Sequence, residues 1–250
     1  MSFQLGKLPA RAGAVKFQMK KYVNLSRLPT PPAEFGHYDL VQNWGVLGNA
    51  QYGDCVWAGA AHETMLWNKE AGRDVAFSTP NVLSDYSAVT GFNKNDSSTD
   101  QGTDMQKAAS YRLKTGVADA NGVRHKIGAY LAIEVGNLEE LLVAGYLFSA
   151  SGTGVLVPDS AQDQFEHEPW SIVQGSQVEG GHYVPFMGMR GGYFRFNTWG
   201  GMQPAKDDWV VKYMDEGFAY ISYEMLTEDK SIDGFDRQQL LDNVNALTPN

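Results

Sequence analysis

Apolar and polar positions divide the chain into a helical first half and a strand-rich second half. Residues 55–70 are rich in Ala, Met, Leu and Glu, with Asp54 at the expected N-cap and Gly72 just beyond the last turn. This pattern predicts a helix that is buried along much of its length. Further helices are predicted at 80–90, 104–115 and 137–146.

The second half contains short β-branched and aromatic runs that are separated by glycines, a pattern typical of strands. The predicted strands are 155–157, 182–189, 192–196, 209–213 and 218–223. Helices followed by strands favour an α+β fold, in which a helical N-terminal lobe packs against an antiparallel sheet or open barrel in the C-terminal lobe.

Charge separates a short N-terminal arm, residues 1–33, from the rest of the chain. The arm holds six basic side chains and no acidic one, whereas the remaining residues carry a net charge of −15. A proline-rich stretch, 28–32, excludes helix at the junction. The arm is expected either to be solvated or to dock on the acidic body, on a partner or on an anionic surface. An acidic body without clustered Lys and Arg excludes general nucleic-acid binding.

Composition is that of a globular protein, with 43% hydrophobic and 20% charged residues. No window of 18 apolar residues predicts a membrane span, and the N-terminus lacks the apolar core of a signal peptide. The single Cys cannot form an internal disulfide. These features predict a cytoplasmic protein, with virion association as an alternative.

A metal centre is not expected. The polar loop 91–104 lacks the residue spacing of a calcium-binding EF-hand loop. One Cys and scattered histidines also lack the ligand spacing of a zinc site.

Cys55 is the first candidate for chemistry, because it lies in the first turn of the predicted helix. A helix N-terminus favours the thiolate, which is the nucleophilic form of cysteine. The neighbouring Asp54 opposes this effect, so a second cation such as an imidazolium is required.

His182 is the favoured partner among the five histidines His37, His62, His125, His167 and His182. It follows Gly180 and Gly181 at the start of a predicted strand. Asn197 is suited to accept the second imidazole N–H, and Trp199 to shield that hydrogen bond. The other histidine on the predicted helix, His62, is interpreted as a core or surface residue.

These segments resemble the papain-type cysteine peptidases in order and spacing. The matching pieces are Gly48 to Trp57, Gly102 to Met105, His182 and Asn197 to Gly200. His182 follows Cys55 by 127 residues and Asn197 follows it by 142, close to the range of about 130–150 that characterises this class. The resemblance covers about residues 38–225.

The resemblance implies a role for each matching residue. Cys55 is the nucleophile, His182 the general base and acid, Asn197 the orienting residue and Trp199 the indole that covers their contact. For the oxyanion hole, Asn49 is favoured over Gln51, because it stands six residues before the nucleophile as the family's Gln does. Gly102 and Thr103 resemble the backbone strip that pairs with an extended peptide.

The resemblance also implies one papain-like catalytic domain over residues 34–250. Within it we expect a helical lobe at about 38–145, a β lobe at about 146–225 and a tail at 226–250. The aromatic after the nucleophile is displaced to Trp57, and the family's disulfides and long helical pro-region are missing. These departures favour a bacterial or phage-encoded relative.

The leading hypothesis is therefore a cysteine peptidase that needs no cofactor and acts on a peptide or protein substrate through an acyl-enzyme. Two alternatives stay open: a non-catalytic binding or virion structural module, and a cell-wall amidase or endopeptidase. The sequence leaves the oligomeric state open.

Overall fold

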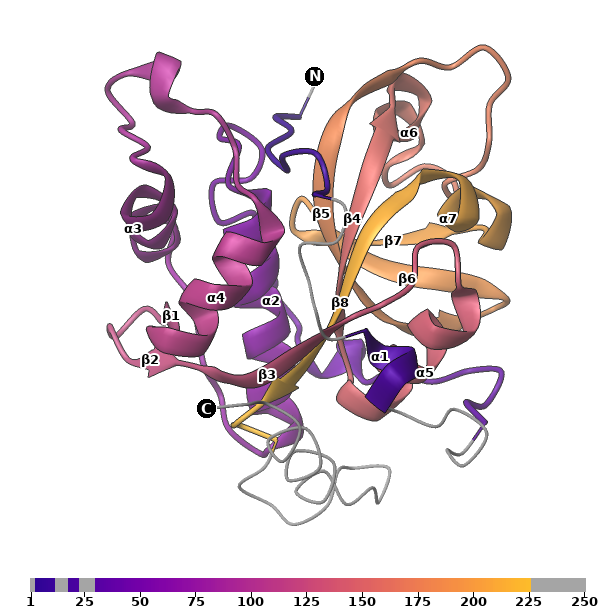
Figure 1. Cartoon of the computed structure of the whole chain (residues 1–250), viewed down its shortest axis with the longest axis horizontal. Coiled ribbons are helices and arrows are strands. Elements are labelled where there is room, and N and C mark those ends of the chain that lie inside the picture. The colour runs from indigo at the N-terminus through magenta and orange to yellow at the C-terminus, as the bar shows by residue number, and fades with distance from the viewer. Residues whose placement is uncertain (1–2, 12–17, 23–29, 226–250) are drawn as a thin grey trace.

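A helical layer and an open antiparallel sheet pack against each other, and the N-terminal segment runs between them (Figure 1). The computed structural model describes residues 3–11, 18–22 and 30–225. The predicted tail, residues 226–250, lies outside the described residues.

The helical lobe is built around α2 (Cys55–Glu70), with α3 (Thr79–Thr90) and α4 (Met105–Lys114) beside it (Figure 1). Every residue of α2 from Cys55 to Asn68 is buried, which confirms the predicted burial. Ser78 caps α3 by accepting from the N–H of Asn81, and Asp104 caps α4 in the same way. Short elements complete this lobe: η2 (Tyr38–Leu40), η3 (Ser97–Thr99), β1 (Val117–Ala118) and β2 (Arg124–His125).

The second lobe is a six-stranded sheet in the order β3-β8-β4-β5-β6-β7, with every neighbouring pair antiparallel. Its strands are β3 (Ile127–Ala132), β4 (Ser151–Pro158), β5 (Val178–Arg190), β6 (Tyr193–Thr198), β7 (Gly201–Ala205) and β8 (Met214–Ser222). Because β3 and β7 are the two edges, the sheet is open and is not a closed barrel. The α+β prediction is confirmed.

Helices around the sheet are α1 (Met19–Tyr22), α5 (Leu138–Phe148), α6 (Asp159–Gln164) and α7 (Asp207–Tyr213). The last of these corrects the sequence analysis, which predicted a strand at 209–213. Two aspartates in the first turn stabilise a helix N-terminus. Trp209, Val210 and Tyr213 are buried while Val211 and Lys212 face solvent, which is a helical spacing and not an alternation.

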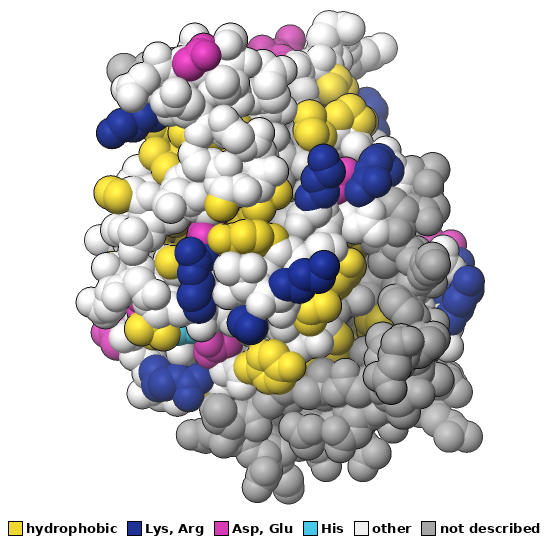
Figure 2. Space-filling model, turned by 60° about the vertical axis from the view of Figure 1, so that its left-hand side comes forward, with side chains coloured by type: hydrophobic (Ala, Val, Ile, Leu, Met, Phe, Trp, Pro, Cys, Tyr) yellow, Lys and Arg dark blue, Asp and Glu magenta, His cyan; other side chains and the backbone are white. Residues whose placement is uncertain are grey.

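Each lobe has its own hydrophobic core, one under the sheet and one around α2. Among the described residues, no helix is both long and apolar enough to cross a membrane. On the face shown in Figure 2, Lys and Arg side chains are scattered among apolar and uncharged surface.

A buried polar cluster joins helices of the first lobe to strands of the second. Glu63 of α2 lies 2.7 Å from the Arg112 guanidinium of α4, and Tyr183 of β5 donates a 2.6 Å hydrogen bond to the other Glu63 oxygen. Arg112 also lies over the ring of Tyr220 in β8, 4.2 Å from its centroid. Glu63, Arg112 and both tyrosines are almost fully buried, so these contacts tie two helices to two strands.

We predict that Glu63→Gln destabilises the chain by about 3–5 kcal/mol, because it leaves the Arg112 cation buried without a counter-charge. The double variant Glu63→Gln/Arg112→Met should lose less, since it removes both charges. Urea unfolding measures both, with Lys114→Met on the exposed face of α4 as the matched control. A double variant at least as unstable as the single one would contradict the charge argument.

Candidate active site

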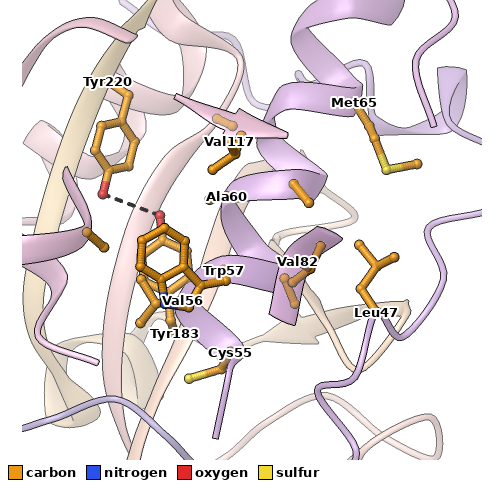
Figure 3. Close-up of a cluster of buried hydrophobic side chains, with 14 of the residues drawn as sticks. Leu47, Cys55, Val56, Trp57, Ala60, Met65, Val82, Val117, Tyr183 and Tyr220 are labelled. Carbon is orange, nitrogen blue, oxygen red and sulfur yellow. Dashed lines mark hydrogen bonds between the residues drawn. The ribbon is translucent and has the colours of Figure 1, made fainter. Parts of the chain in front are cut away.

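Cys55 is the first residue of α2, and its side chain is completely buried at the interface with β5. Figure 3 shows it at the end of the helix, close to the labelled Tyr183. The backbone N–H groups of Tyr183 and Gly6 face its sulfur. Burial raises the pKa of the Cys55 thiol to about 12, and the two N–H groups oppose that rise only in part. In this state the sulfur carries its proton.

His182 lies in β5, opposite Val155 of β4, directly before the residue whose N–H faces the Cys55 sulfur. Its Nε2 lies 2.7 Å from the Thr198 hydroxyl oxygen. Its Nδ1 is buried and has no hydrogen-bond partner in the described part of the chain. Burial lowers the pKa of His182 to about 3, so the imidazole is neutral. A tautomer protonated at Nε2 would donate to Thr198 and leave Nδ1 as a free base, whereas a tautomer protonated at Nδ1 would accept from the Thr198 hydroxyl.

Asn197 lies elsewhere than the resemblance implies. Its Nδ2 donates to the sulfur of Met202 at 3.6 Å, and its carboxamide lies beside His62. The group on His182 is Thr198, which the sequence analysis did not select. Successive side chains of a strand point to opposite faces, so these two neighbours cannot both face the imidazole.

His62 is a satisfied core residue, one of the two readings left open. Its Nε2 hydrogen-bonds the carbonyl of Gly45 at 2.9 Å, and burial lowers its pKa to about 4.

The two oxyanion candidates differ in burial. Asn49 is 2% exposed, and its Oδ1 has no hydrogen-bond partner among the described residues. Gln51 is exposed to solvent. Both lie in the turn before α2, where Leu47 and Gly48 adopt positive φ angles of 55° and 103°.

The groove between the lobes holds an extended segment of the chain itself, residues 3–8. The N–H of Lys7 donates to the Gly181 carbonyl at 2.9 Å, on the sheet side. On the helical side, Thr103 donates to the Gly6 carbonyl at 2.7 Å and accepts from the N–H of Leu8 at 3.0 Å. The segment therefore pairs with both walls, parallel to Thr103 and antiparallel to Gly181.

Glycines let these backbones approach. A Cβ on Gly6 would lie 2.0 Å from the Gly53 carbonyl oxygen, and one on Gly102 would lie 2.3 Å from the Gly6 carbonyl oxygen. Neither position tolerates a side chain without movement of the backbone. Gly102 and Thr103 thus contact an extended segment of the same chain, and their role toward a substrate peptide remains a prediction.

Trp199 lies between the imidazole and the segment. Its ring stacks on His182 with centroids 4.8 Å apart and on Phe3 with centroids 4.4 Å apart. Its φ is +47°, a conformation that costs a bulky residue free energy and that is concentrated at functional sites. The indole covers one face of His182 and keeps water from it.

Asp54 stands at the N-cap position of α2, but its side chain makes no capping hydrogen bond, which corrects the expected cap. Both carboxyl oxygens are buried and lack a hydrogen-bond partner in the described residues. Burial raises the pKa of Asp54 well above its ordinary value. The raised pKa favours the protonated carboxyl, and protonation weakens the predicted repulsion between Asp54 and a Cys55 thiolate.

Solved structures share this arrangement of lobes, although no family model and no curated protein matches the sequence. Xylellain, a cysteine protease from Xylella fastidiosa, aligns over 88% of this chain and 96% of its own with TM-score 0.65 and 15% identity. Procathepsin B S9 from Trypanosoma congolense aligns over 87% of this chain and 86% of its own, with TM-score 0.59 and 13% identity.

A cysteine protease from Carica candamarcensis, solved with E-64, aligns over 76% of this chain and 98% of its own, with TM-score 0.55 and 13% identity. The chain has the papain-like fold. At these identities the likeness concerns the fold, and the chemistry must be argued from the side chains.

The protonated Asp54 leads to a pH-dependent prediction. Above pH 3.8 the unfolded state releases this proton before the folded state does, so Asp54 makes the free energy of unfolding fall as pH rises. Asp54→Asn should therefore gain stability relative to the natural chain as pH rises from 4 to 8. Thermal unfolding across that range measures the difference, with exposed Asp163→Asn as the control. Parallel pH curves for the natural chain and Asp54→Asn would show that the buried carboxyl is ionised.

Proposed function

We propose that the protein is a cysteine peptidase that hydrolyses peptide bonds through a Cys55 acyl-enzyme. The observation that carries the proposal is the contact between the start of α2 and β5. It brings the Cys55 sulfur against the residue that follows His182, at the wall of a groove that holds an extended peptide segment. A nucleophile, a base and a peptide-binding groove are the parts that acyl transfer requires.

In the proposed mechanism, His182 Nδ1 takes the proton from the Cys55 sulfur, which attacks the carbonyl carbon of the substrate. The oxyanion is held by the backbone N–H of Cys55 and by the side-chain amide of Asn49. We choose Asn49 over Gln51 because its side chain is buried beside the helix start. The imidazolium then protonates the leaving amine, and water activated by His182 releases the acid.

The resting state is an inhibited one in this proposal. The segment presents the N–H of Gly6 to the sulfur, while the Gly6 carbonyl is bonded to Thr103. Buried under this segment, both Cys55 and His182 are neutral. Departure of the segment admits water and substrate, and a thiolate–imidazolium pair then becomes accessible.

The same burial supports a second candidate, in which the papain-like fold serves as a binding module without turnover. A filled groove and a protonated thiol suit a protein that exchanges its own segment for a partner's peptide. A bacterial or phage origin, the division into an arm and one catalytic domain, and a cytoplasmic location remain predictions from the sequence.

Cleavage of a peptide library, read by mass spectrometry, separates the two candidates. We expect the natural chain to cleave slowly, Lys7→Ala to cleave faster because its segment is held less tightly, and Cys55→Ala to cleave nothing. Cell-wall muropeptides are included to test the amidase alternative. Cleavage that survives in a folded Cys55→Ala chain would overturn the mechanism, and no cleavage by any variant would favour the binding module.

The contact between Thr198 and the imidazole gives a separate prediction. Thr198→Val keeps the shape of the side chain but removes the hydroxyl, so kcat should fall about 10-fold or more, and the acidic limb of the pH profile should shift. Thr198→Ser should restore both, which a merely structural role would not require. The comparison variant is Asn197→Ala. If it costs more activity than Thr198→Val, the imidazole is oriented by Asn197 during turnover, as the resemblance implies.

A further inference from the structure

The side chain of Lys7 leaves the groove and enters a pocket between the sheet and the start of α4. The side chain is completely buried, and its Nζ lies 2.8 Å from Asp215 Oδ2 and 3.0 Å from the Leu8 carbonyl oxygen. Asp215 lies in β8, next to the central strand β4. The pocket therefore ends in a carboxylate at the depth that a lysine side chain reaches.

The wall of this pocket is shaped around the aliphatic part of the lysine. A Cβ on Gly154 of β4 would lie 2.1 Å from Lys7 Cε and 2.9 Å from the sulfur of Met105. Any larger residue at this position would collide with the side chain in the pocket. Met105, the first residue of α4, supplies the facing apolar surface, so both lobes contribute to the pocket.

The Asp215 carboxylate gives the pocket its charge preference. One oxygen of Asp215 bonds Lys7, while the other is buried without a hydrogen-bond partner in the described residues. Burial raises the pKa of the adjacent Glu216 to about 7, and the charge of Lys7 opposes that rise. A neutral occupant would leave the Asp215 carboxylate, whose side chain is only 17% exposed, without its counter-charge, which is costly.

The pocket opens beside the reacting groups. Lys7 is bonded through its backbone to Gly181, the residue before His182, and the N–H of Gly6 faces the Cys55 sulfur. Any extended peptide that pairs with Thr103 and Gly181 presents a side chain at the mouth of this pocket. Lys7, which occupies the pocket, directly follows Gly6, the residue whose N–H faces the Cys55 sulfur.

We propose that the Lys7 pocket, formed by Met105, Gly154 and Asp215, is the specificity pocket of this site and selects a lysine side chain of the peptide substrate. The inference rests on the proposed peptidase function and names its substrate class. Lys7 of the chain's own segment occupies the place of that substrate lysine.

Binding tests the pocket without any need for catalysis. The full chain carrying Cys55→Ala and Lys7→Ala is titrated calorimetrically with the peptide Phe-Gln-Leu-Gly-Lys-Leu-Pro and with its norleucine counterpart, which lacks only the amino group. We expect the lysine peptide to bind about 10- to 100-fold more tightly, the range for a buried hydrogen bond to a charged group. Adding Asp215→Asn should remove most of this difference, whereas exposed Asp208→Asn should leave it unchanged.

Cleavage tests the substrate class. With Lys7→Ala and Cys55 intact, a peptide library should show lysine enriched at one fixed distance from the cut. The kcat/KM for a cleaved lysine peptide should exceed that for its norleucine counterpart by about the same 10- to 100-fold. Asp215→Asn should abolish the preference, and its circular dichroism spectrum should match that of the natural chain, which shows that the variant is folded.

The outcomes separate this inference from the proposed function. Lysine-dependent binding without any cleavage overturns the peptidase and keeps the pocket. Cleavage without a lysine preference overturns the specificity pocket and keeps the peptidase. If the folded chain neither binds the lysine peptide nor cleaves, both are overturned.

Discussion

The buried contact of Glu63 with Tyr183 and Arg112 is the constraint on which the arrangement of the site depends. Glu63 lies about two turns along α2 from Cys55, and Tyr183 directly follows His182 in β5. The hydrogen bond from Tyr183 to Glu63 fixes the height and the rotation of α2 against β5. The ring of Tyr183 packs directly on Gly59 of α2. A Cβ at Gly59 would lie only 2.4 Å from this ring, so the helix and the strand approach closely because this position is a glycine. The position of the sulfur relative to the imidazole strand follows from this packing.

Burial favours the uncharged forms of Cys55, Asp54 and His182, although the charged pair of Lys7 and Asp215 lies close by. It raises the pKa of the Cys55 thiol and of the Asp54 carboxyl, and lowers that of His182, so each is neutral. A thiolate–imidazolium pair in this environment would have to overcome desolvation of two charges. In the proposed mechanism, activation therefore requires departure of the segment, because departure brings solvent or a polar substrate to Cys55 and His182.

Local signals in the sequence predicted most of the helices and the position of Cys55, because caps and helix periods act within a few residues. The error at Trp209–Tyr213 arose because β-branched and aromatic residues also occur in short helices that bury one face. Thr198 was missed because the choice between adjacent strand residues depends on which face meets His182, a matter of register across the sheet. The position of residues 3–8 could not be predicted for the same reason. The basic charge of the arm was compatible with docking on the acidic body, but long-range pairing with Thr103 and Gly181 leaves no local pattern in the sequence.

The glycines of the groove bear on how a peptide is recognised there. Gly6, Gly102 and Gly181 allow contact between backbones, and backbone hydrogen bonds form with almost any sequence. Backbone pairing of this kind holds a peptide in place but does not select it by its sequence. Discrimination must then come from the few side chains that leave the backbone plane, and in the bound segment these include Phe3 on Trp199 and Lys7 on Asp215. Of these two contacts only the second buries a charge, and a buried charge penalises a neutral occupant more heavily than a stacked ring penalises an aliphatic one.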